Sequence, residues 1–150
     1  MNHAAYLAVL VLGCSLALHA GAAESGRSRL DAASNIVAAV NAKDAVLYTR
    51  DLAEDVVVAM YDGDIRLRGR AAVRANREEH FRRHPAVRNE LVHLVEIDDR
   101  VVMHDRVWLT PEQEQAADIV EVFTFSGAEI VRIDVLQPGS LFASTANENQ

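Results

Sequence analysis

The sequence predicts an α+β domain in which three helices come first and a mostly antiparallel sheet follows. Apolar residues recur at helical spacing before Pro85, and apolar and polar residues alternate in most of the chain after it. Helices followed by a run of strands are typical of an α+β chain, with the helices packed on one face of the sheet. A length of 150 residues is expected to form one domain.

The N-terminal 23 residues are predicted to be a signal peptide and not part of the domain. An almost unbroken apolar run ends near Leu18 and is too short for a comfortable membrane span. The small residues Ala20-Gly21-Ala22 favour cleavage before Ala23 or Glu24, and hence a secreted or periplasmic protein. The less favoured alternative is a lipoprotein with lipid on Cys14, since the apolar run continues past that residue.

Few residues of the chain are candidates for cofactor or metal chemistry. Cys14 is the only cysteine, so a cleaved chain would have no disulfide, no thiolate nucleophile and no cysteine-based zinc site. His80 and His84 have the i, i+4 spacing of a helical metal pair, but no further histidine or cysteine lies nearby. We therefore interpret them as histidines on a helix face, and no metal or cofactor is expected.

Arginines are concentrated in one segment of a chain whose formal net charge is -7. A solvated helix face beside an edge strand is the favoured interpretation of this cluster. A patch for anionic ligands is the alternative; nucleic acid is disfavoured because the chain is acidic and no stacking aromatic residues interleave the arginines. No membrane contact is expected after removal of the signal peptide. The cluster comprises Arg66, Arg68, Arg70, Arg74, Arg77, Arg82, Arg83 and Arg88.

The helices and the first two strands have recognisable starts and ends. Ser28 or Asp31 is a candidate cap for the first helix, and Asp44 for a second, short helix. A β-branched strand is expected over 56–61, and Asp62-Gly63 predicts a tight turn into a second strand over 64–68. The third helix is expected over 70–84, because Pro85 disfavours its continuation.

Four long strands are predicted after Pro85. The expected ranges are 87–98, 101–110, 117–125 and 129–136, separated by polar or glycine-containing turns. The domain is therefore expected to span 28–138, and residues 139–150 are expected to form a loose tail.

This order of elements is similar to that of a known superfamily. The stretch IVAAVNAKDAVLYTRDLAEDVVVA (36–59), followed by DGDIRLRGRAAVRANREEHFRRH, resembles the opening half of the nuclear transport factor 2-like fold, in its SnoaL-like and ketosteroid-isomerase-like branch. The resemblance covers about residues 36–136 and implies a cone-shaped fold with a strongly curved sheet and one pocket. It implies binding of a small, largely apolar molecule, with isomerase-, dehydratase- or cyclase-type acid–base activity. The alternative is a non-catalytic binding or dimerisation module.

The resemblance also indicates which catalytic positions this chain has kept. It places Met60 at the general-base position of the isomerases and Ile36 at their tyrosine position, and neither side chain can transfer a proton. The third position falls on Glu121. Steroid isomerisation by the family mechanism is therefore not expected.

Three polar residues on the predicted strands are candidate catalytic groups. Glu121 shares a strand face with Phe123 and Phe125, so a raised pKa and a role as an acid are expected. His93 lies in mid-strand on an apolar face, where it could act as the base, although a core histidine is the more common outcome. The resemblance places Asp105 inside the pocket, but a slip of one residue in the register would turn it outward.

Further pocket and interface residues complete the set of expectations. Tyr48, Met60, Phe123 and Phe125 are expected to line the pocket, with the hydroxyls of Tyr48 and Tyr61 orienting a ligand. A sheet with apolar side chains on both faces must cover both. The face away from the helices, with Trp108 and the strand around Val122, is therefore predicted to form a homodimer interface, as in similar proteins.

Overall fold

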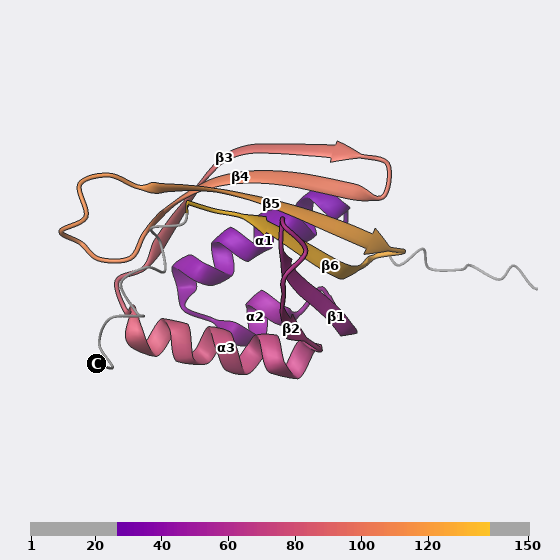
Figure 1. Ribbon diagram of the computed structural model, residues 1–150, viewed down its shortest axis with the longest axis horizontal. Helices are drawn as coiled ribbons and strands as arrows, with labels where there is room; N and C mark the ends of the chain where they lie inside the picture. Colours follow the sequence, from indigo (N-terminus) through magenta and orange to yellow (C-terminus); the bar gives the residue numbers. More distant parts are fainter. Residues whose placement is uncertain (1–26, 139–150) are drawn as a thin grey trace, which may run out of the picture.

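The computed structural model describes residues 27–138, and in this range the predicted α+β architecture is confirmed. Figure 1 shows the helices together on one side of a curved sheet, with α3 farthest from the strands β3 to β5. The predicted signal peptide, Cys14 and the predicted tail lie outside the described residues. Within the described part of the chain, no helix has the length and apolarity needed to cross a bilayer.

Three helices form this layer, and polar side chains begin two of them. Helix α1 spans Arg29–Ala42, and the Ser28 side chain accepts a hydrogen bond from the Asp31 backbone N–H at its start. Lys43 ends α1 in the left-handed conformation, with φ of 58°. Helix α2 spans Ala45–Thr49 and is capped by Asp44, whose carboxylate accepts from the Leu47 N–H at 2.8 Å. Helix α3 spans Arg70–Arg83.

The six strands form a single sheet in the order β2-β1-β6-β5-β4-β3. All neighbouring strands are antiparallel except β1 and β6, which are parallel. The last four strands match the predicted ranges closely, and β1 begins earlier than predicted because Leu52 already belongs to it. The strands are β1 (Leu52–Met60), β2 (Ile65–Arg68), β3 (Arg88–Ile97), β4 (Arg100–Trp108), β5 (Ala117–Ser126) and β6 (Glu129–Leu136).

The core lies between the helices and the inner face of the sheet. Phe123, Ile130 and Ile133 are fully buried there, with Met103 and Leu52 beside them. Burying each of these large side chains contributes roughly 1.5–3 kcal/mol to folding. This single core fixes the sheet against α1, so the inner side chains of β4, β5 and β6 point into the space that the helices enclose.

Strand β3 contains an irregularity that reverses its side-chain alternation. Leu91 pairs with Asp105, but His93 pairs with His104, so two steps along β3 match one step along β4. The extra residue is a β-bulge, which moves the following side chains to the opposite face. His93 therefore lies on the opposite face of the sheet from Leu91, which an uninterrupted alternation would place beside it.

Candidate functional site

A cavity of about 630 Å³ lies between α3 and the inner face of the sheet. This volume is within the range typical of small-molecule sites, roughly 300–1,000 Å³. Its lining is largely apolar, with polar side chains concentrated on the middle of the sheet and on α3. The apolar lining consists of Ile36, Val40, Val58, Met60, Leu67, Val87, Val107, Leu109, Ile119, Ile133 and Val135, and the polar lining of Tyr48, Arg66, Asn76, Arg77, His80, Asn89, Asp105, Glu121 and Gln137.

Glu121 lies on the cavity wall in the middle of β5. Its neighbours across the sheet are Met103 on β4 and Val135 on β6, so the carboxyl group has apolar side chains on both sides. Burial, and then the charge of Asp105, raise the pKa of Glu121 to about 8, although the Arg77 guanidinium opposes the rise. At neutral pH Glu121 is therefore mainly a neutral acid that can donate a proton or a hydrogen bond.

Asp105 lines the same cavity from β4, with only 1% of the residue exposed. Its Oδ2 accepts a short hydrogen bond from the Asn89 side chain, whereas Oδ1 has no partner among the described residues. Burial raises the pKa of Asp105 to about 6, against the opposing effects of the Asn89 hydrogen bond and of His104. Near pH 7 the cavity thus contains one carboxylate with a free oxygen, beside one carboxylic acid.

Two hydrogen bonds between α1 and β3 hold Asn89 in position. The Asn41 side chain donates to the Asn89 carbonyl at 2.9 Å and accepts from the Asn89 N–H at 2.8 Å. β3 is an edge strand, so it has no neighbouring strand on its outer side. The Asn41 side chain therefore takes the place of the backbone groups that a neighbouring strand would offer to Asn89. It also fixes the Asn89 amide that donates to Asp105.

Helix α3 contributes a cation and a neutral imidazole to the cavity. Arg77 lies over the Tyr48 ring, 5.3 Å from its centre, and donates to Asn76 Oδ1 from Nε and Nη2 at 3.2 and 2.7 Å. Burial, and then the charge of Arg77, lower the pKa of His80 to about 4, so its ring is neutral at pH 7. Burial and then the charge of Glu121 raise the pKa of Tyr48, which therefore remains a phenol.

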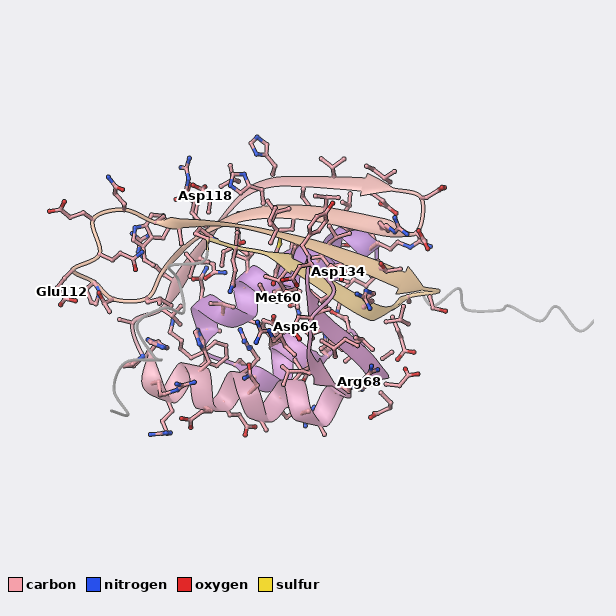
Figure 2. The ribbon with its side chains drawn as sticks, viewed as in Figure 1. Met60, Asp64, Arg68, Glu112, Asp118 and Asp134 are labelled. Atoms are coloured by element: carbon pink, nitrogen blue, oxygen red, sulfur yellow. The ribbon has the colours of Figure 1, made fainter. Side chains whose placement is uncertain are left out.

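The structure brings together four of the seven predicted site residues. Glu121, Asp105, Tyr48 and Met60 all line the cavity, and the predicted inward register of β4 is correct. In Figure 2, Met60 lies between the sheet and α3. The acid–base pair available in this cavity is therefore Glu121 with Asp105.

Two of the predicted pocket residues, and the tyrosine expected to orient a ligand, lie outside the cavity. Phe123 and Phe125 point inward but are packed in the core and do not reach the cavity. Alternation along one strand indicates that these side chains point inward, but not whether they reach the cavity. Tyr61, expected to orient a ligand, lies in the turn after β1 and is 71% exposed.

His93 is the main correction, because the bulge in β3 turns it to the outer face of the sheet. There its Nδ1 lies 3.3 Å from Nδ1 of His104, and His104 Nε2 lies 2.8 Å from Asp118. Figure 2 shows Asp118 on the side of the sheet away from α3. His93 and Glu121 do not share a cavity, and His93 cannot act as the base.

The inward position of Arg77 on α3 was not expected from the sequence. Arg77 was assigned to a solvated arginine cluster, and His80 to a helix face without a role. Val73 and Phe81 are both buried, and Arg77 lies four residues from each, on the same side of the helix. This i, i+4 spacing is the feature of the sequence that could have indicated an inward position for Arg77. Among residues 27–138, no three histidine, cysteine, aspartate or glutamate side chains gather as ligands of one metal ion.

Solved structures with the same fold support this architecture. An uncharacterised cystatin-fold protein from Novosphingobium aromaticivorans has a TM-score of 0.67 and 27% identity, with 74% of this chain and 99% of that chain covered. A candidate ketosteroid isomerase from Kribbella flavida has a TM-score of 0.62 and 16% identity, covering 73% and 77%. A candidate SnoaL-like polyketide cyclase from Jannaschia sp. CCS1 has a TM-score of 0.63 and 13% identity, covering 83% and 97%.

The helices and the curved sheet around this mostly apolar cavity have the nuclear transport factor 2-like fold. A model of the SnoaL-like domain matches residues 33–133. The chain belongs to the SnoaL-like domain family. No curated protein matches it.

Proposed function

We propose that the protein binds a small, largely apolar molecule in the cavity and performs acid–base chemistry on it. The observation that carries this proposal is the placement of two carboxyl groups of raised pKa, Glu121 and Asp105, in one cavity with a largely apolar lining. Similar structures named as a candidate isomerase and a candidate cyclase agree with this reaction type.

The two carboxyl groups would divide the proton transfers between them. Glu121, as a neutral acid, would donate a hydrogen bond to a carbonyl oxygen of the ligand, and Asp105 would accept a proton from the adjacent carbon. Return of that proton to a different carbon completes an isomerisation. Alternatively, Glu121 protonates a departing hydroxyl group, water leaves, and the proton on Asp105 restores Glu121.

Proton exchange from carbon tests this proposal without knowledge of the natural substrate. Small cyclic ketones such as 1-indanone would be incubated with the protein in D₂O, and deuterium next to the carbonyl group would be followed by NMR. We expect the wild-type protein to accelerate the exchange and Asp105→Asn to abolish the acceleration, while the loop variant Glu112→Gln behaves as wild type. Ketones that bind without accelerated exchange would contradict catalysis and leave a binding protein.

A second candidate function, association through the outer sheet face, rests on a different observation. Val95 and Ile97 are 50% and 60% exposed there, beside the half-buried Val102 and Val122. We propose that a second copy of the chain covers this face. Light scattering should then show a wild-type dimer and a folded Val95→Glu monomer, and a monomeric wild-type protein would contradict this proposal.

A further inference from the structure

Arg77 lacks a carboxylate partner within the described residues, unlike Arg70, Arg82 and Arg83 on α3. Arg74 lacks one too, but it donates to the Thr49 hydroxyl at 3.2 Å and does not line the cavity. Arg70 lies 3.3 Å from Glu54, Arg82 lies 2.6 Å from Glu79, and Arg83 lies 3.3 Å from the same glutamate. Arg77 lines the cavity instead, and its described hydrogen bonds go to one neutral oxygen of Asn76. A partly buried guanidinium group with only an amide and an aromatic ring as partners is unusual, because a desolvated charge needs compensation.

The carboxyl groups of the cavity do not supply that compensation by contact. Asp105 and Glu121 line the same cavity, yet the described side-chain contacts of Arg77 go to Asn76 and Tyr48 and to neither carboxyl group. Asp105 is instead hydrogen-bonded to Asn89, on the part of the cavity wall formed by β3 and β4. The guanidinium group and the carboxyl groups therefore line one cavity without an ion pair between them, which leaves the guanidinium group available to a ligand.

We propose that the ligand is an apolar monocarboxylic acid whose carboxylate pairs with Arg77. This proposal rests on the proposed function, because it names the class of molecule that the same cavity takes. A guanidinium group binds a carboxylate through two parallel hydrogen bonds, which fixes both the position and the orientation of the ligand. The apolar body then lies against Val58, Ile133 and Val135, with Glu121 and Asp105 beside it.

The charged groups of the cavity favour a ligand with one negative charge over a ligand with two. One guanidinium group compensates one anionic charge, and the other arginine that lines the cavity, Arg66, is already paired with Asp64 at 3.1 Å. A phosphate or sulfate ester with two negative charges would also meet the carboxylate of Asp105. Repulsion between like charges in a partly desolvated site makes this costly.

Matched acid and amide pairs test the inference directly. Benzoate, 2-naphthoate and 2-anthroate would each be compared by calorimetry with the neutral amide of the same ring system. In the wild-type protein we expect the best-fitting acid to bind about tenfold or more tightly than its amide, as a charge-assisted pair predicts. The preference should weaken as salt is added, whereas the affinity for the amide should not.

Two substitutions in α3 test whether the preference for the acid over its amide depends on Arg77. Arg77→Gln should remove the preference for the acid and retain the affinity for the amide, with an unchanged circular dichroism spectrum. Arg83→Gln removes a charge outside the cavity and should behave as wild type. Equal binding of acid and amide by the wild-type protein, or a preference that persists in Arg77→Gln, would overturn the inference and leave the cavity proposal intact. Binding of no probe by the wild-type protein would overturn both.

Discussion

Replacing Glu121 with glutamine should change how the stability of the protein depends on pH. In the folded protein the pKa of Glu121 is raised from 4.5 to about 8, because the ionised carboxylate would be buried among apolar side chains and close to Asp105. The unfolded chain releases this proton at the ordinary pKa. Between these two values the folded state binds more protons than the unfolded state, so stability falls as pH rises.

The size of the effect follows from the two pKa values. Each pH unit between them lowers the free energy of unfolding by about 1.4 kcal/mol, and the loss is complete above the folded-state pKa. Between pH 6 and pH 9 the wild-type protein should therefore lose about 3 kcal/mol through Glu121. Glutamine has the shape of the protonated acid and does not titrate, so Glu121→Gln should not show this loss.

Urea unfolding at pH 6 and pH 9, followed by circular dichroism, measures the difference. Contributions that both proteins share, including that of His80, cancel when the variant is compared with wild type. The loop variant Glu112→Gln is the matched control and should follow the wild-type pH dependence. Parallel pH dependences for wild type and Glu121→Gln would refute the reasoning, since Glu121 would then ionise at the same pH in the folded and unfolded states.

Four further predictions concern stability, the correction at His93, and processing. Phe123→Ala should lower the free energy of unfolding by about 4 kcal/mol in urea, because it leaves a cavity in the core; a loss below about 1 kcal/mol would contradict this placement. Asp44→Ala should cost about 1 kcal/mol in the same assay through loss of the α2 cap. His93→Ala should change neither ligand affinity in calorimetry nor, beyond about 0.5 kcal/mol, stability; weaker binding would place His93 at the site after all. Intact mass of the protein from its host should show a chain beginning at Ala23 or Glu24.

The sequence predicted the fold well because its helices and turns are specified locally. Asp44 acts as the predicted cap, and Gly63 adopts φ of 96° in the predicted turn, although that turn is longer than two residues. In both cases neighbours in the sequence decide the conformation. The inward position of Asp105 was also correct, but it was expected from the family resemblance, because alternation along β4 alone does not say which face is inside.

The site was predicted less completely because it depends on contacts between distant segments. The bulge that turns His93 outward is set by the pairing of β3 with β4, and alternation along β3 alone gives no sign of it. Phe125 looked like a cavity residue because its position relative to α1 cannot be read from one strand. Arg77 was grouped with the arginines around it in the sequence, although its spacing of four residues from Val73 and from Phe81 places it on the buried side of α3.

The sheet order has a consequence for how the chain is assembled. The last strand, β6, lies between β1 and β5, and without it the sheet would be two separate pieces, a two-stranded hairpin and a three-stranded meander. A growing chain therefore carries an unsatisfied edge on β1 until residues 129–136 arrive to pair with it in parallel. Such late, long-range pairing is typical of slow folding, and any chain that ends before Glu129 presents two open edges to aggregation.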